Sequence, residues 1–312
     1  MLNVLITGYS GFVGSHLLEQ LKDNFNLSLL GRTKPNINCK FLYASIDDST
    51  DYSSFLEDVD VIVHVAARVH IMMDTENDPL EEYRAINVRG TINLAEQAAK
   101  QGVKRFIFVS SIKVNGEKTL PNKPFSEADS RLPEDDYGLS KKEAEEQLEI
   151  ISGQTRMEYV FIRPPLVYGQ GVKANFASLF KFVGKRIPLP FRAITNNRRS
   201  LVSVYNLIDL IKVCVDHPNA ANQIFLVSDD KDISTSEMVA LMAKVQGFPN
   251  FSLPLPLCCF HLLGKLLSKQ DIIDRLVGSL QVDITHTKNT LNWTPPFSIE
   301  EGFAKCIEKK DV

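Results

Sequence analysis

The 312-residue chain lacks the features of a nucleic-acid binder or an integral membrane protein. Its 35 basic side chains are balanced by 38 acidic ones, so the net charge of −3 gives no reason to expect a nucleic-acid partner. No run of about 18 apolar residues, the length that a bilayer-spanning helix needs, occurs in the sequence. The N-terminus has no basic segment followed by an apolar one, so we expect no signal peptide.

Cysteine is also scarce, and no internal repeat or low-complexity tract is present. The five cysteines are odd in number and lack the spacing of metal ligands: Cys39, Cys214, Cys258, Cys259 and Cys306. We therefore expect reduced thiols, no bound metal and a cytoplasmic location.

Short apolar runs alternate with helical patterns through the first half of the chain. The runs at 2–7, 27–30, 60–66, 105–110 and 158–164 predict buried strands. Helical patterns lie at 51–57, 78–101 and 137–151. This alternation predicts an α/β fold, a doubly wound parallel sheet with helices on both faces. Ligands of such sheets bind beyond the carboxyl ends of the strands, where this chain places its small and polar residues.

The second half is less regular. Residues 164–200 contain one amphipathic segment (175–184), and a helix near 205–216 and a strand near 223–227 follow. Residues 228–312 are mostly helical in pattern. We expect a dinucleotide-binding Rossmann domain of residues 1–163 plus 201–227. Residues 164–200 plus 228–312 would form a smaller, mostly helical substrate lobe.

A glycine-rich turn follows the first predicted strand. Gly8, Gly11 and Gly14 have the spacing G-x-x-G-x-x-G and precede a helical pattern. Glycines allow the backbone to approach a pyrophosphate, whose charge the free N–H groups of a helix N-terminus stabilise. The order strand, glycine turn, helix therefore predicts a dinucleotide site.

A second candidate feature is Tyr137 with Lys141, 26 residues after the Ser110-Ser111 pair. On a helix these two side chains share one face, and an ammonium beside a phenol lowers the pKa of the tyrosine. Such a tyrosine can act as a general acid or base near neutral pH. A solvated helix face is the alternative interpretation of the pair alone.

These motifs together resemble the extended short-chain dehydrogenase/reductase superfamily. The resemblance spans most of the chain and rests on the following segments: TGYSGFVG (7–14), HVAA (64–67), INVRGT (86–91), FVSSIKVNG (108–116), YGLSK (137–141), RPPLVYG (163–169) and LNWTPP (291–296). It implies a doubly wound sheet, a bound NAD or NADP and, in most members, a nucleotide-sugar substrate.

The resemblance also implies roles for particular residues. Tyr137 would be the acid/base, Lys141 would bind the nicotinamide ribose and lower the tyrosine pKa, and Ser111 would hydrogen-bond the reacting oxygen. The implied cofactor contacts are Gly8, Gly11, Phe12, Val13, Gly14, Arg32, Ala66, Ala67, Asn87, Ser110, Tyr137, Lys141 and Pro164. The implied substrate contacts are Asn175 and two cations for a diphosphate, Arg199 and Arg275, with ordinary surface charge as the alternative for the arginines. Lys113 is an unusual residue two positions after Ser111, and we expect it to line the sugar pocket.

The end of the second strand bears on the choice of cofactor. NAD-specific relatives carry an acidic residue there, whereas this chain continues with Gly31, Arg32, Thr33 and Lys34. An arginine suits the 2′-phosphate of NADP, which we therefore expect ahead of NAD. Arg32 and Lys34 as ordinary loop cations, or a carboxylate from Asp47 or Asp48, are the alternatives.

The type of reaction is narrowed by the residues after Ser111. Dehydratases of the superfamily have Asp-Glu there, and this chain has Ile112 and Lys113. The wider sequence resembles bacterial polysaccharide enzymes that reduce a 4-keto-6-deoxy-N-acetylglucosamine unit to N-acetylquinovosamine. We expect such a 4-reductase, with the sugar on UDP or undecaprenyl diphosphate. A UDP-sugar 4-epimerase is the alternative, and a non-enzymatic dinucleotide sensor is a third class.

The segment 251–267 is strongly apolar but interrupted by prolines and too short to span a bilayer. We expect it to pack on the substrate lobe, with peripheral contact to a membrane as the alternative. The superfamily resemblance further implies a homodimer formed through helices 78–101 and 137–151.

Overall fold

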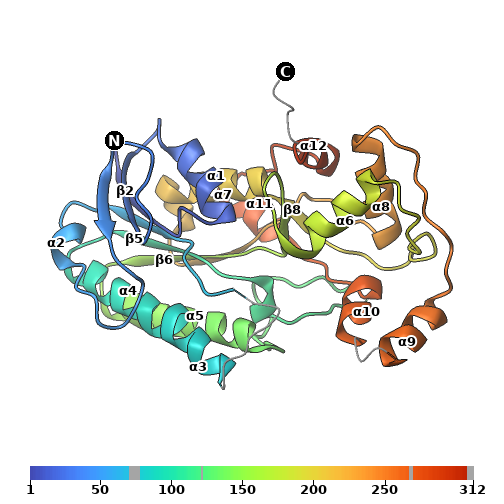
Figure 1. The fold of residues 1–312 in the computed structure, drawn as a ribbon. Helices are drawn as coiled ribbons and strands as arrows, with labels where there is room; N and C mark the ends of the chain where they lie inside the picture. The colour runs from blue at the N-terminus through green and yellow to red at the C-terminus, as the bar shows by residue number, and fades with distance from the viewer. Residues whose placement is uncertain (70–77, 121, 267–269, 308–312) are drawn as a thin grey trace.

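The computed structural model describes residues 1–69, 78–120, 122–266 and 270–307. Its main feature is a parallel sheet of seven strands in the order β3-β2-β1-β4-β5-β6-β9 (Figure 1). The strands are β1 (Asn3–Thr7), β2 (Asn26–Gly31), β3 (Lys40–Tyr43), β4 (Val61–His64), β5 (Arg105–Val109), β6 (Glu158–Arg163) and β9 (Gln223–Leu226).

Helices cover both faces of the sheet, as a doubly wound fold requires (Figure 1). One face carries α1 (Phe12–Leu21), α7 (Val204–Asp216) and α11 (Thr285–Leu291). The other carries α3 (Pro79–Tyr83), α4 (Thr91–Lys100) and α5 (Asp136–Gln154), with α2 (Ser53–Leu56) at the β2 end. Side chains alternate accordingly: Val4 and Ile6 of β1 join one buried cluster and Leu5 joins the other. The predicted fold class is confirmed.

In the main sheet and the helices that cover it, two elements differ from the sequence prediction. The edge strand β3 was not expected, because its four residues are too few to show an alternating pattern and none is fully buried. The expected helix 78–101 is divided into α3, a π-helix η1 (Arg84–Gly90) and α4. Gly90 lies at the π-to-α junction against the backbone of Ile46, where a Cβ would come within 2.9 Å of that backbone.

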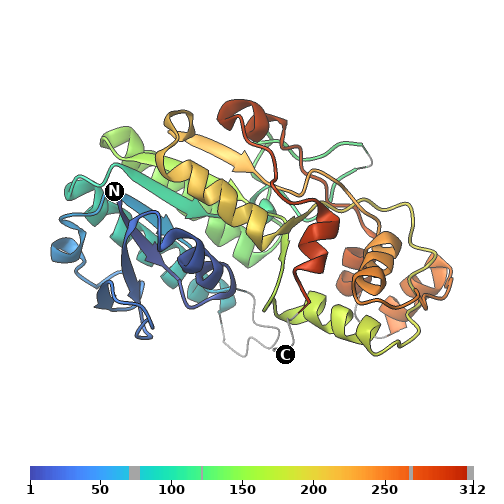
Figure 2. The same cartoon turned by 90° about the horizontal axis from the view of Figure 1, so that it is seen from above.

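A smaller group of elements lies at the other end of the molecule (Figures 1 and 2). It contains α6 (Ala174–Gly184), α8 (Thr235–Val245), α9 (Leu257–Leu266), α10 (Gln270–Val277), α12 (Ile299–Ala304) and a two-stranded sheet of β7 (Leu166–Tyr168) and β8 (Leu201–Ser203). Most of these elements surround a buried cluster of their own, which includes Tyr168, Phe176 and Phe303. The helical C-terminal portion is therefore present as expected, although Leu291 at the end of α11 and Trp293 after it join the main core.

No helix among the described residues is long and apolar enough to cross a membrane. Within the apolar segment 251–267, α9 begins at Leu257, and Phe260 is buried and stacks on Phe191. Part of the segment thus packs on the lobe as expected. Residue 267 of this segment lies outside the described residues.

Candidate active site

The small and polar residues singled out from the sequence follow four neighbouring strands. Gly8 comes after β1, Ala66 and Ala67 after β4, Ser110 after β5 and Pro164 after β6, and these strands are adjacent in the order β1-β4-β5-β6. Because all four are parallel, their carboxyl ends lie at the same edge of the sheet. The structure therefore brings these residues to one edge.

The glycine turn brings backbone against backbone. Gly8 has a φ of +72°, and a Cβ on it would lie 2.5 Å from the amide nitrogen of Ala66. A Cβ on Gly14 would lie 2.1 Å from the carbonyl oxygen of Gly8. Only glycine fits at these two positions. The turn leads into α1, and its N-cap residue Gly11 has no side chain that could bond the first N–H groups of the helix.

The N-terminus of α1 and the carboxyl ends of the neighbouring strands fit a dinucleotide. Phe12 and Val13 form the first turn of the helix and are half-buried. The Ser110 hydroxyl is buried and has no hydrogen-bond partner among the described residues. A buried hydroxyl without a partner is unfavourable in a protein alone and suits contact with a polar ligand.

Asn87 and Pro164 form hydrogen bonds that fix the backbone around the site. The buried Asn87 amide donates to the Arg68 carbonyl and the Ser140 hydroxyl at 3.0 Å each, and its oxygen accepts from the Arg68 N–H at 2.8 Å. Asn87 thus joins the segment after β4 to α5. The carbonyl of Pro164 accepts from the Ile112 N–H at 3.0 Å, next to Ser111.

Tyr137 and Lys141 lie on successive turns of α5, near the end of β5. The Lys141 ammonium donates to the Val109 carbonyl at 2.9 Å and lies 4.2 Å from the centre of the Phe108 ring. Tyr137 packs edge-on against Tyr83. The Ser111 hydroxyl caps the 3₁₀ turn η2 (Ile112–Val114) by accepting from the Lys113 N–H at 3.3 Å.

The expected lowering of the tyrosine pKa is not what the structure shows. Burial raises the pKa of Tyr137, and the nearby Asp135 and Tyr83 raise it further. Burial lowers the pKa of Lys141 to about 7, against the opposing charge of Glu145. The Lys141 ammonium is directed at the Val109 carbonyl and the Phe108 ring. The cost of desolvating a Tyr137 phenolate therefore outweighs the attraction of the Lys141 ammonium for it.

Three of the four expected substrate contacts gather around Glu117. Its carboxylate accepts from Lys113 at 2.7 Å and lies 3.4 Å from the Arg275 guanidinium. Arg199 donates to the Arg275 carbonyl at 2.7 Å. Burial and the charge of Arg275 lower the pKa of Arg199, while Glu117 opposes them. Lys113 also pairs with Asp135, the N-cap of α5, so this cluster adjoins Tyr137.

The remaining predicted residues lie further from this cluster. Asn175 is exposed on the first turn of α6, and Arg32 is exposed in the loop after β2. Neither carboxylate considered for the ribose is free in the structure. Asp47 accepts from Ser49 and Thr50 within its own loop, and Asp48 lies 3.4 Å from Arg89.

Sequence reasoning missed His64, which lies under the site at the end of β4. It is fully buried between Thr7 (2.9 Å) and Thr91 (3.1 Å) and stacks on Phe108, the ring that faces Lys141. Burial and the Lys141 charge lower its pKa to about 3, so the imidazole is neutral at pH 7. In the sequence His64 begins the HVAA segment and lies in an apolar run, and neither feature identifies its partners.

The fold and the site define a dinucleotide-binding protein of the short-chain dehydrogenase/reductase type. The profile of the NAD dependent epimerase/dehydratase family matches residues 4–228. The chain belongs to this family and is an enzyme of it.

Curated relatives extend the match over the whole chain. A UDP-glucose 4-epimerase of Vibrio cholerae is 54% identical over 310 residues, which cover 98% of this chain and 94% of that protein. An N-acetyl-alpha-D-glucosaminyl-diphospho-ditrans,octacis-undecaprenol 4-epimerase of Escherichia coli is 26% identical over 99% of this chain and 96% of its own length.

Solved structures agree on the fold. A UDP-glucose 4-epimerase from Thermotoga maritima with UDP-glucose has a TM-score of 0.77 at 21% identity and covers 98% of this chain and 97% of its own. A UDP-glucuronic acid 4-epimerase from Bacillus cereus in complex with NAD has a TM-score of 0.78 at 21% identity, with coverage of 97% and 94%.

Proposed function

We propose that this enzyme is an NAD-dependent 4-epimerase of a UDP-sugar. The observation that carries the proposal is the placement of Ser111, Tyr137 and Lys141 near the carboxyl end of β5, in a sheet whose strand β1 ends in the glycine turn on the same side. The chain is also 54% identical to a UDP-glucose 4-epimerase. The curated relatives described above are named as 4-epimerases. They therefore support the alternative interpretation of the sequence over the expected N-acetylquinovosamine-type 4-reductase.

The residues of the site would divide the work as follows. Tyr137 exchanges a proton with the C4 oxygen of the sugar, and Ser111 donates a hydrogen bond to the same oxygen. Lys141, between Val109 and the site, would bind the ribose hydroxyls of the cofactor. The raised pKa of Tyr137 keeps its proton in place, so it needs added positive charge to act as a base. The oxidised nicotinamide, when bound, supplies the hydride acceptor and such a charge.

The residues present fit a nicotinamide dinucleotide, and we propose NAD as the cofactor. Gly8, Gly14 and the open N-terminus of α1 would hold the pyrophosphate, and the Ser110 hydroxyl would gain its missing partner. The family description and the Bacillus cereus structure both name NAD, which favours NAD over the NADP expected from Arg32. Arg32 is exposed, so it can serve as a loop cation.

The cationic cluster around Glu117 would receive the diphosphate of the substrate. Arg275 is held by Glu117 at 3.4 Å, longer than a strong charge-assisted bond, and its side chain is half-exposed. A diphosphate can therefore replace Glu117 as the partner of Arg275. Lys113, a member of this cluster two residues after Ser111, would line the sugar pocket, and Asn175 remains a proposed contact from α6.

The proposal is tested by incubating the purified protein with UDP-glucose, and in parallel with UDP-N-acetylglucosamine, without added cofactor. Proton NMR should show the C4 epimer, and the denatured protein should release NAD. A protein that arrives without NAD and consumes NADH or NADPH with a UDP-linked 4-keto-6-deoxy sugar would instead be the 4-reductase.

A further inference from the structure

The apolar side chains that remain exposed are concentrated on one part of the smaller lobe. Among the described residues, 16 large hydrophobic side chains are exposed, and half of them fall within 182–187 and 251–272. They are Phe182, Ile187, Phe251, Leu253, Leu257, Leu262, Leu266 and Ile272. Single exposed apolar residues are ordinary, but such a concentration indicates an interaction surface.

Helix α9 shows the pattern most clearly. Two residues pack its inward side on the lobe. Phe260 is buried against Phe191, and Gly264 packs against α10. The opposite side still carries apolar residues, because Leu262 is 61% exposed and Leu266 is 73% exposed. A helix that packs on a core normally turns polar residues to water.

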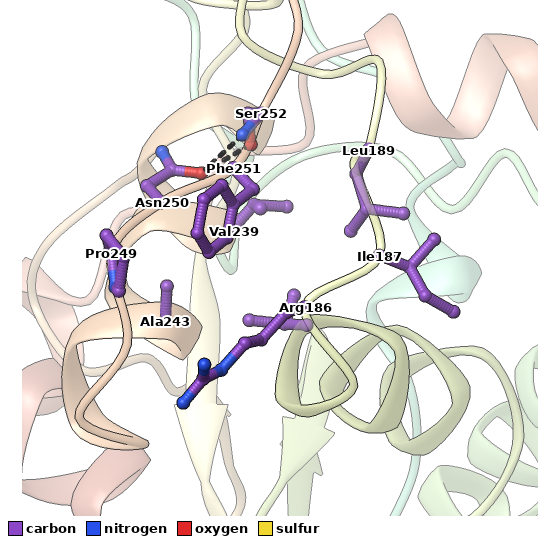
Figure 3. A pocket seen from close by; sticks show the side chains of 10 residues that line it. Arg186, Ile187, Leu189, Val239, Ala243, Pro249, Asn250, Phe251 and Ser252 are labelled. Atoms are coloured by element: carbon purple, nitrogen blue, oxygen red, sulfur yellow. Dashed lines mark hydrogen bonds between the residues drawn. The ribbon is translucent and has the colours of Figure 1, made fainter.

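The segments that supply these side chains are joined. Leu189 pairs with Ser252 and Phe191 with Pro254, so the chain after α6 runs beside the chain that enters α9. Figure 3 shows the same neighbourhood from close by, with Arg186, Ile187 and Leu189 facing Phe251 across a small cavity. The surface of 181–192 and 251–266 is named the α9 face below.

The α9 face is also free of acidic side chains. Residues 159–208 contain eight Lys and Arg and no Asp or Glu, and residues 238–266 contain two Lys and no Asp or Glu, in a chain whose net charge is −3. Lys181, Lys185, Arg186, Arg192 and Lys265 are all exposed. A cationic surface with protruding leucines matches an anionic phospholipid bilayer, which attracts each basic residue and accepts the apolar side chains.

We propose that the α9 face docks this enzyme on an anionic bilayer surface. The proposal does not depend on the sugar or on its carrier. The contact would be peripheral, with the apolar side chains of α9 inserted at the level of the headgroups. Helix α10 packs against α9 and carries Arg275 of the cationic cluster, so the docked face would lie next to the candidate substrate site.

The test is co-sedimentation of the purified full-length protein with two kinds of vesicle, one of phosphatidylcholine alone and one rich in phosphatidylglycerol. We expect binding to the anionic vesicles that weakens with salt. The variant Leu262→Ser/Leu266→Ser should bind about tenfold more weakly, because two leucines lose apolar burial. Lys181→Glu/Lys185→Glu should lose the preference for phosphatidylglycerol.

The matched control is Tyr43→Ser/Leu132→Ser, which removes two equally exposed apolar side chains elsewhere, at 73% and 68% exposure. It should bind the vesicles as the unchanged protein does. Equal binding by the leucine variant and the control, or no binding by the unchanged protein, would overturn the proposal. A leucine variant that turns a dimer into a monomer without vesicle binding in either form would assign the α9 face to a second copy of the chain instead.

Discussion

Tyr137 and Lys141 have pKa values displaced in opposite directions by the same cause. Burial disfavours the charged form of each group, so the phenol keeps its proton and the lysine loses its proton more easily. At neutral pH the site therefore holds a proton on Tyr137, and Lys141 is only partly charged. This arrangement suits a site whose missing positive charge is supplied by the cofactor.

Replacing Tyr137 by Phe removes the hydroxyl that exchanges the proton and leaves the ring contact with Tyr83 in place. We expect turnover to fall by about a hundredfold to ten-thousandfold, the usual effect of losing a general acid/base. Epimer formation measured by NMR tests this, and an unchanged unfolding temperature shows that the fold is intact. Full activity in the variant would remove Tyr137 from the mechanism.

Replacing Lys141 by Met tests the buried ammonium through stability. The pKa of Lys141 is about 7 in the folded protein and 10.5 for an ordinary lysine, so between these pH values the unfolded chain binds more protons. The unchanged protein should therefore gain stability relative to the variant as pH rises from 7 to 10.5, by on the order of 4 kcal/mol. Urea unfolding after removal of cofactor, at pH 6.5 and pH 10, measures the difference. A difference that does not vary with pH contradicts the burial of the charge.

At the scale of elements, a buried ion pair joins β6 to α5 below the site. Arg163 and Glu145 are fully buried and bond through both carboxylate oxygens, and Arg163 also donates to Asn115 at 3.0 Å. Arg131 lies 3.3 Å from the same carboxylate. These contacts fix α5, and with it Tyr137 and Lys141, relative to the ends of β5 and β6.

The variant Arg163→Met should lose about 3 kcal/mol of stability, because it leaves the Glu145 carboxylate buried with Arg131 as its only cation. The double variant Arg163→Met/Glu145→Met should recover most of the loss, since no charge is then left unpaired. Denaturant unfolding of both variants gives the comparison. A single variant as stable as the unchanged protein would show that the pair does not hold the two elements together.

The turn between β1 and α1 gives a prediction with an internal control. Gly14→Ala places a Cβ 2.1 Å from the Gly8 carbonyl and must displace the turn. Gly153→Ala on α5 meets nothing within 4 Å and replaces a poor helix former by a good one. The NAD content of the purified protein should fall at least about tenfold in Gly14→Ala and stay unchanged in Gly153→Ala. Equal NAD content in the two proteins would exclude the turn as the pyrophosphate site.

The sequence predicted those elements that have a local pattern. The buried strands of the main sheet and the glycine turn were visible because each has a continuous apolar run or a fixed glycine spacing. Strand β3 was not visible, because its four edge residues are exposed or half-buried and show no alternation of buried and exposed positions. The partners of Lys141 and the ion pair of Arg163 with Glu145 depend on which elements meet in space, so no local pattern could show them. The same limit produced the wrong direction for the pKa of Tyr137.

At the scale of the whole molecule, the candidate site joins both ends of the structure. Ser111 follows β5, and Tyr137 and Lys141 lie on α5. The smaller lobe contributes Arg199 and Arg275, and Arg275 contacts Glu117. Two features remain predictions. One is the division into two domains, 1–163 plus 201–227 and 164–200 plus 228–312. The other is a homodimer formed through the helices of 78–101 and 137–151. A reaction that returns the hydride to the same sugar requires the cofactor to stay bound, which no single residue determines.

The most direct test of the proposed function is therefore a reaction with no external redox partner. The purified enzyme is mixed with UDP-glucose alone, and the anomeric signals of UDP-glucose and UDP-galactose are followed by proton NMR, with UDP-N-acetylglucosamine as the parallel substrate. A 4-epimerase converts one C4 epimer into the other until equilibrium, with NAD recovered from the denatured protein. No conversion of either sugar, together with stoichiometric consumption of NADH or NADPH by a UDP-linked 4-keto-6-deoxy sugar, would contradict the proposal.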